Sequence, residues 1–133
     1  MSEENVDLVR RSIAMFTSGE EERSIREFAV PEIEFVSRFG EMDGRTYQGL
    51  TEIRDYIADI EETWERYERE LEELVDAGDA VVAVMRITAV SRATGLEVNE
   101  RIGLVYWLEN GRITRMVSYS SVDEALEAAR PPR

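Results

Sequence analysis

Residues 79–120 read DAVVAVMRITAVSRATGLEVNERIGLVYWLENGRITRMVSYS, and this stretch decides the fold. It divides into three runs rich in β-branched and aromatic residues, Asp79–Ser91, Leu96–Leu108 and Arg112–Ser120. The second and third runs are joined through Asn110-Gly111, a pair that accepts the positive φ angles of a tight hairpin turn. The stretch therefore predicts three consecutive antiparallel strands.

Outside this stretch, apolar residues that recur every three or four positions indicate amphipathic helices. Ser2, Thr51 and Ser121 are the expected N-caps, because a short hydroxyl side chain accepts a hydrogen bond from a free amide of the first turn. Pro31 is expected to end the second helix. The predicted helices are Glu3–Thr17, Glu20–Phe28, Thr51 to about Trp64, and Val122–Ala129.

Two further segments have a strand pattern. Acidic and apolar residues alternate over Glu32–Ser37, and a short strand is expected near Tyr47. Residues 65–76 are rich in helix formers, yet the turn Ala77-Gly78-Asp79 follows them directly before a strand. We interpret Arg69–Asp76 as a strand that pairs with its successor.

The order of these elements predicts an α+β fold in which helices pack on one face of a curved antiparallel sheet. The 133 residues fit one domain, residues 1–133. A curled sheet closed by helices forms a cone with a hollow end, which is a natural site for a small molecule.

Composition excludes several kinds of chemistry. The chain has no cysteine, no histidine and no lysine, so thiolate nucleophiles, the usual zinc ligands and Schiff bases are absent. No calcium-binding loop is recognisable, and we expect neither a metal nor an organic cofactor. A net charge of −13 argues against a nucleic-acid partner. No apolar run approaches the roughly 20 residues of a membrane span, and the acidic N-terminus is unlike a signal peptide, so a cytoplasmic protein is expected.

Several strings resemble the SnoaL-like branch of the NTF2-like superfamily, which includes ketosteroid isomerases and limonene-epoxide hydrolases. The matching strings are Glu3-Glu-Asn-Val-Asp-Leu-Val-Arg-Arg, Phe16-Thr-Ser-Gly, Pro31-Glu-Ile-Glu-Phe-Val-Ser, Tyr47-Gln-Gly-Leu-Thr-Glu-Ile-Arg, Asp76-Ala-Gly-Asp and Leu108-Glu-Asn-Gly-Arg-Ile-Thr-Arg. The resemblance covers nearly the whole chain and implies an NTF2-like cone, with a mixed or antiparallel sheet around an internal cavity. It is weaker for the reaction, because this fold hosts many activities.

The catalytic residues of both enzyme groups are missing at the places that the resemblance implies. By counting from Gly19 and from the Asn110-Gly111 turn, the isomerase tyrosine, base and acid fall on Ser12, Val36 and Leu104. For the epoxide hydrolases, the arginine falls on Arg86, whereas the carboxylates fall on Thr88 and Ser118. Neither mechanism is expected.

Strand alternation extends these placements to a predicted cavity wall. Arg86 is the predicted anchor for an anion or a carbonyl, and the alternative is a structural ion pair with Glu100 or Glu34. Glu34 and Glu100 are the candidate general bases, since they are the acids within apolar strand runs. Predicted catalytic residues are therefore Arg86, Glu100 and Glu34, and predicted ligand-binding residues are Phe16, Val36, Trp64, Thr88, Ile102, Leu104, Tyr106, Met116 and Ser118.

The opposite face of the sheet is predicted to carry apolar side chains, among them Val105, Trp107, Val117 and Tyr119. Such a face favours a homodimer, although a crossing C-terminal tail is an alternative cover. The leading functional hypothesis is a protein that binds a small hydrophobic molecule. The hypothesis extends to an isomerase, cyclase or hydrolase activity that uses acid–base chemistry by carboxylate, arginine and tyrosine side chains. The alternative is a non-catalytic dimerising or accessory module.

Overall fold

The computed structural model describes residues 2–37 and 44–130. Its helices are α1 (Ser2–Thr17), α2 (Glu21–Phe28), α3 (Gly49–Thr63) and α4 (Val122–Ala129). Its strands are β1 (Ala29–Val36), β2 (Thr46–Gln48), β3 (Trp64–Asp76), β4 (Ala80–Ser91), β5 (Glu97–Glu109) and β6 (Arg112–Tyr119). The predicted α+β class is confirmed.

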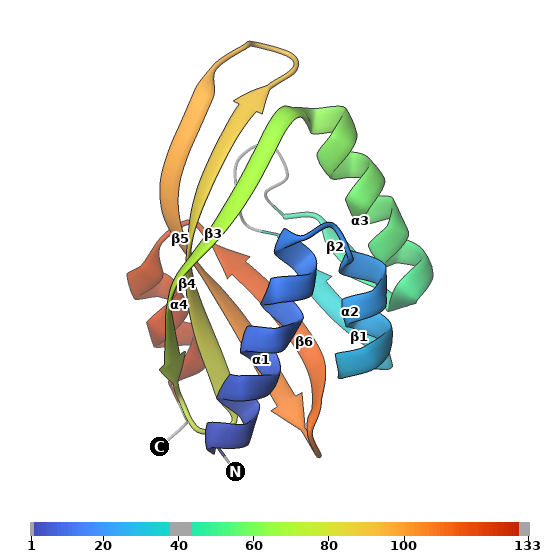
Figure 1. Ribbon diagram of the computed structural model, residues 1–133. Helices are drawn as coiled ribbons and strands as arrows, with labels where there is room; N and C mark the ends of the chain where they lie inside the picture. The colour runs from blue at the N-terminus through green and yellow to red at the C-terminus, as the bar shows by residue number, and fades with distance from the viewer. Residues whose placement is uncertain (1, 38–43, 131–133) are drawn as a thin grey trace.

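The strands form one six-stranded sheet in the order β2-β1-β6-β5-β4-β3. Neighbouring strands are antiparallel except for β1 and β6, which are parallel, so the sheet is mixed. The predicted hairpin between β5 and β6 is present, with positive φ angles of 52° at Asn110 and 74° at Gly111. The sheet is long and curved (Figure 1).

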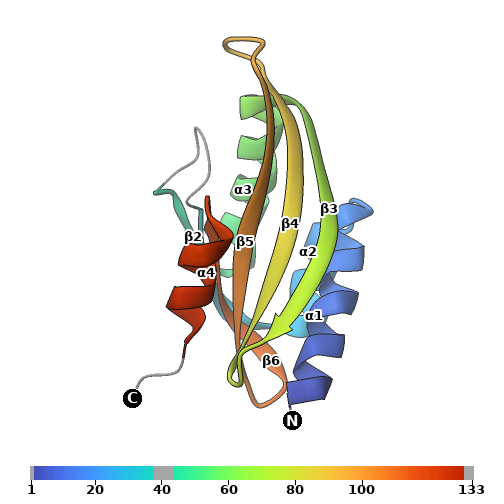
Figure 2. The ribbon, with the colours of Figure 1, turned by 90° about the vertical axis from the view of Figure 1, so that its left-hand side faces the viewer.

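Helices cover both faces of the sheet, not one (Figures 1 and 2). Helices α1, α2 and α3 pack on the inner face, where their apolar sides meet those of the strands in the main core. Helix α4 packs on the outer face, and its Ala125 and Ala129 lie against Val82 and Val105. Gly103 of β5 permits this contact, because a Cβ atom there would lie 2.3 Å from the Cβ of Ala125.

The strand boundaries differ from the sequence expectation by more than one residue at the starts of β1 and β3. Strand β1 begins at Ala29, directly after α2, and includes Pro31 at an irregularity in its pairing with β6, where proline is tolerated. Strand β3 begins at Trp64, because it pairs along almost the full length of β4 and this pairing overrides the helix propensity of its residues. A bulge between Leu71 and Glu73 adds one residue to β3.

Two of the three expected helix caps are wrong. Ser2 already belongs to α1, and α3 begins at Gly49, two residues before Thr51. The backbone amide of Gln48, which precedes α3, donates to Glu52 Oε1 at 2.8 Å. Ser121 is the predicted N-cap of α4, and its Oγ accepts from the backbone amide of Glu124 at 3.3 Å.

The outer face exposes less apolar surface than predicted. Val105 and Val117 are fully buried within this chain, while Trp107 and Tyr119 are half-buried. The guanidinium of Arg115 lies over the Trp107 ring, 5.1 Å from its centroid. Helix α4, the last element of the chain, therefore provides much of the cover for which the sequence offered a partner subunit or a crossing C-terminal tail. Among the described helices, none is long and apolar enough to cross a membrane.

Candidate functional site

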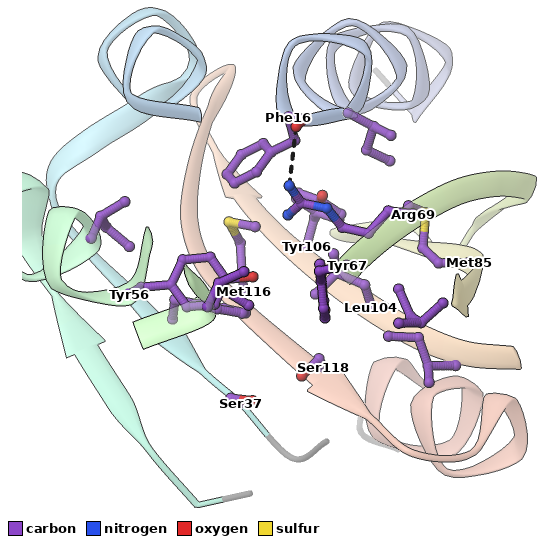
Figure 3. Close-up of a pocket in the computed structure, with 16 residues that line it drawn as sticks. Phe16, Ser37, Tyr56, Tyr67, Arg69, Met85, Leu104, Tyr106, Met116 and Ser118 are labelled. Atoms are coloured by element: carbon purple, nitrogen blue, oxygen red, sulfur yellow. Dashed lines mark hydrogen bonds between the residues drawn. The ribbon is translucent and has the colours of Figure 1, made fainter. Parts of the chain in front are cut away.

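A pocket lies between the inner face of the sheet and the helices (Figure 3). Its open volume is about 40 Å³, which holds roughly three water molecules. Most of the wall is apolar, and the polar groups are serine and tyrosine hydroxyls and one guanidinium. The lining residues are Ile13, Phe16, Phe35, Ser37, Ile53, Tyr56, Ile60, Tyr67, Arg69, Met85, Ile87, Ile102, Leu104, Tyr106, Met116 and Ser118.

Arg69 of β3 is the cation of this pocket, and its contacts are defined. Its Nη2 donates to the backbone carbonyl of Phe16 at 3.1 Å and to Glu21 Oε2 at 3.1 Å. The Arg69 and Glu21 side chains are only 16% and 17% exposed. Burial alone acts to lower the pKa of Arg69, but Tyr56, Tyr67 and Glu21 outweigh it and raise the pKa. Arg69 is thus a permanent cation that joins β3 to α1 and α2.

Three tyrosines surround Arg69 in the pocket (Figure 3). Burial is the main cause that raises the pKa of Tyr56, Tyr67 and Tyr106. For Tyr56, the positive charge of Arg69 and hydrogen bonds with Tyr67 and Arg69 act in the opposite direction. All three phenols therefore stay protonated at neutral pH and are available as hydrogen-bond donors.

Aromatic rings form one side of the pocket. The Tyr56 ring meets Phe35 edge-on at a centroid distance of 4.7 Å and Tyr47 at 5.3 Å. Tyr47 is fixed in turn by a 2.7 Å hydrogen bond from its hydroxyl to Asp59 Oδ2. This packing limits the freedom of Tyr56 and holds its hydroxyl in place.

Six of the predicted ligand-binding residues line the pocket. For β5 and β6, the side chains that the sequence predicted to face inward do line the pocket. Phe16 of α1 also lines it, as expected. The six are Phe16, Ile102, Leu104, Tyr106, Met116 and Ser118.

The predicted facing of β4 is wrong. Met85 and Ile87 line the pocket, so Arg86 and Thr88, which alternate with them, lie on the outer face. Arg86 Nε donates to Glu72 Oε2 at 3.1 Å and its Nη1 donates to Asn99 Oδ1 at 2.8 Å. A structural ion pair was the alternative interpretation of this arginine, although the carboxylate is neither of the two expected.

The predicted facing of β1 is wrong for the same reason. Phe35 and Ser37 line the pocket, and Glu34 and Val36 therefore point to the outer face. Glu34 Oε1 accepts from Arg115 Nε at 2.8 Å.

The two remaining predicted residues do not line the pocket either. Glu100 pairs with Ile87 and so shares the inner face with it, but the Glu100 side chain is exposed. Trp64 is buried at 3% exposure beside Tyr67, with its ring centroid 6.0 Å from that of Tyr67. The structure does not bring Arg86, Glu100 and Glu34 together.

Sequence reasoning missed Arg69 and Tyr67. Both lie in the run of charges from Glu61 to Glu73, whose simplest interpretation is a solvated face. The signal that finds them is alternation, because Tyr67, Arg69 and Leu71 occupy one side of β3 once the strand is extended to Trp64.

The arrangement can donate hydrogen bonds to a bound oxygen but offers little to abstract a proton. Among the described residues that line the pocket, none is aspartate or glutamate. Within residues 2–37 and 44–130, no group of three or more acidic side chains is placed to hold a metal ion.

Comparison with known proteins supports the fold assignment. The SnoaL-like domain family matches residues 9–116. An NTF2-like protein from Burkholderia thailandensis E264 is 25% identical, with a TM-score of 0.77 over 96% of this chain and 98% of its own. A putative SnoaL-like polyketide cyclase from Jannaschia sp. CCS1 is 20% identical, with a TM-score of 0.70 over 98% and 94% of the two chains.

A third similar structure contains a small molecule. It is a hypothetical protein with a ketosteroid isomerase-like fold from Catenulispora acidiphila DSM 44928, in complex with trimethylamine. It is 17% identical, with a TM-score of 0.70 over 93% of each chain. The search among curated proteins found no match. The predicted NTF2-like fold is thus confirmed.

Proposed function

We propose, from the premise that this chain belongs to the SnoaL-like domain family, that it binds a small, mostly apolar molecule in the pocket of Figure 3. The observation that carries the proposal is the composition of the pocket wall. Apolar side chains form most of it, and Tyr56, Tyr67, Arg69 and Tyr106 converge from α3, β3 and β5. Mostly apolar walls with a few placed polar groups are typical of small-molecule sites.

The solved relatives support binding more than they support one reaction. The Catenulispora protein was solved in complex with trimethylamine, so a protein of this fold binds a small molecule. The Jannaschia protein is named a putative polyketide cyclase, and cyclase chemistry is one activity within the proposed range. At these identities the likeness itself extends to the fold alone.

Acid–base catalysis by Arg86, Glu100 and Glu34 is not supported by the places of these side chains. Arg86 and Glu34 lie on the outer face in ion pairs, and Glu100 is exposed. Electrostatic stabilisation by tyrosine hydroxyls and Arg69 is the chemistry that the described pocket residues supply. The proposed function is therefore binding, with turnover as an additional property to be measured.

The pocket is narrow, and a ligand larger than a few atoms requires side chains to move. Met85, Met116 and Leu104 are suited to this role, because methionine is unbranched and adaptable and Leu104 is only half-buried. The small volume also favours the second candidate, a non-catalytic accessory module whose cone is filled by its own side chains. Homodimerisation and a cytoplasmic location stay predictions from the sequence.

A pair of matched substitutions tests the binding proposal. Leu104→Trp adds bulk inside the pocket, and Thr88→Trp adds the same residue on the outer face of the neighbouring strand. Thermal-shift and calorimetric titrations with small cyclic ketones, alcohols and aromatic hydrocarbons are expected to show binding to the wild type and to Thr88→Trp, but not to Leu104→Trp. Equal binding by all three proteins, or by none, contradicts the proposal. Native mass spectrometry of the same samples reports a retained small molecule and the oligomeric state.

A further inference from the structure

The charge of Arg69 is already compensated within the protein. Its ion pair with Glu21 has an Nη2–Oε2 distance of 3.1 Å, and both side chains are at least four-fifths buried. The same nitrogen donates to the carbonyl of Phe16, as Figure 3 shows. A carboxylate ligand entering the pocket would therefore meet a cation that is already paired, and would add a second negative charge near Glu21. Buried charge without its own partner is strongly unfavourable.

The tyrosine hydroxyls next to Arg69 have donor capacity left over. Arg69 and Tyr56 both line the pocket. A guanidinium only donates hydrogen bonds, so Arg69 makes no use of the phenol proton of Tyr56. That proton is available to a ligand oxygen.

Tyr106 is a second donor. Its side chain is 1% exposed and lines the pocket. Burial raises the pKa of its hydroxyl, so the proton is retained at neutral pH. A buried hydroxyl gains most from an acceptor that enters the pocket.

The pocket is equally unsuited to a cation. Aromatic faces attract ammonium groups, and Phe35, Tyr56 and Tyr106 are among the residues that line the pocket. The described lining residues nevertheless include no carboxylate, and the positive charge of Arg69 lies in the same wall. Repulsion from Arg69 opposes the aromatic attraction for an ammonium ion.

We infer that the pocket selects a neutral molecule that carries one hydrogen-bond-accepting oxygen, such as a cyclic ketone, over carboxylates and ammonium ions of the same size. This inference rests on the proposed function and specifies its ligand class. Tyr56 and Tyr106 donate to the ligand oxygen, the apolar wall encloses the ring, and the Arg69–Glu21 pair excludes charge. The carboxylate of Glu21 is thus a specificity residue that acts through Arg69.

The first test compares three probes of one ring size on the wild-type protein: cyclopentanone, cyclopentanecarboxylate and cyclopentylammonium. Calorimetry or ligand-observed NMR at neutral pH is expected to show cyclopentanone bound at least about tenfold more tightly than either ion. If none of the three binds, the proposed function itself fails. If an ion binds as tightly as the ketone, binding in the pocket stands and the inference about charge is overturned.

The second test changes the charge balance at Arg69. Glu21→Gln keeps the size of the side chain and an oxygen acceptor for Arg69, but removes the compensating charge. The ratio of carboxylate affinity to ketone affinity is expected to rise at least about tenfold in this variant. Because both ligands are measured on the same protein, a change in its stability does not affect the ratio.

Glu22→Gln is the matched control for this test. It removes the same charge one position along α2, where Glu22 pairs with Arg26 and Arg54 on the surface. The ratio is expected to stay within about twofold of the wild type, since surface charges act weakly at a distance. An unchanged ratio in Glu21→Gln, or an equal rise in Glu22→Gln, overturns the role assigned to Glu21.

Discussion

The close contact between Gly103 and α4 makes Gly103→Ala a sharp test of the packing on the outer face. The added Cβ would lie 2.3 Å from the Cβ of Ala125 and 3.4 Å from the Cα of Val122. Both Cβ atoms are attached directly to backbone, so neither can rotate away. The helix and the strand must separate by roughly 1.2–1.7 Å to reach an ordinary carbon–carbon distance of 3.5–4.0 Å.

The size of the effect follows from this displacement. Overpacking of a well-packed interface costs about 1–3 kcal/mol, and alanine regains about 0.5–1 kcal/mol over glycine within a strand. The difference between these two terms leaves a net effect, so we expect Gly103→Ala to lower the free energy of unfolding by about 1 kcal/mol. Ala125→Gly, which removes the opposing methyl group, costs about 1 kcal/mol through helix propensity.

Urea unfolding of the wild type, both single variants and the double variant completes a double-mutant cycle. The loss of unfolding free energy in the double variant is expected to be smaller than the sum of the two single losses by at least about 1 kcal/mol. Ketone binding should be unaffected, because Gly103 and α4 lie on the face opposite the pocket. Additive effects within about 0.5 kcal/mol would refute the argument that this contact positions α4.

Three other predictions concern single side chains. Ser121→Ala removes the side-chain acceptor of the Glu124 amide and is expected to lower the free energy of unfolding by about 1 kcal/mol, measured by urea titration; no change would contradict the capping role. Tyr106→Phe removes one donor and should weaken cyclopentanone binding by roughly three- to tenfold in calorimetry, whereas unchanged affinity would exclude Tyr106 from recognition. Burial, and then the hydrogen bond to Asp59, raises the pKa of Tyr47 from 10.0 to about 12, so the folded protein holds this proton more tightly than the unfolded chain. That contribution to stability is present below about pH 10 and is lost as the pH rises towards 12. The free energy of unfolding in urea should therefore fall less between pH 10 and 12 for Tyr47→Phe than for the wild type. An equal fall in the two proteins would count against the raised pKa of Tyr47.

The inward-facing residues of β5 and β6 could be predicted because the sequence of these strands distinguishes their two faces. In β5, Leu104 and Tyr106 alternate with Gly103 and Val105, and the Asn110-Gly111 turn sets the pairing with β6. The family resemblance then implied that the inner face of the sheet surrounds a cavity. These strands supplied five of the six correctly predicted pocket residues.

Strand β4 shows why the remaining predictions failed. Residues 80–85 are buried on both faces, since helices pack on each side, so hydrophobic alternation does not tell inside from outside. When alternation does not mark the two faces, a position inferred by counting along the strand is easily wrong by one residue. An error of one residue exchanges the inner and outer faces for every side chain of the strand. Arg86 was therefore predicted to lie inside when it lies outside.

Arg69 was hidden for the opposite reason. Its neighbours Glu68 and Glu70 are exposed, and the local composition favours a helix. Only pairing with β4, a contact distant in sequence, fixes this segment as a strand and turns Arg69 and Tyr67 inward. The fold could be predicted from local patterns, whereas the polar residues of the pocket depended on tertiary contacts.

The central claim, that a small neutral molecule enters this pocket, is tested most directly by NMR of the methionine methyl groups. The chain has five methionines; Met85 and Met116 line the pocket, whereas Met15 lies on α1 outside the lining. Titration with cyclopentanone is expected to move the Met85 and Met116 resonances with one common affinity and to leave Met15 unchanged, with no response in Leu104→Trp. Resonances of Met85 and Met116 that stay fixed, or that move equally in Leu104→Trp, would contradict the account.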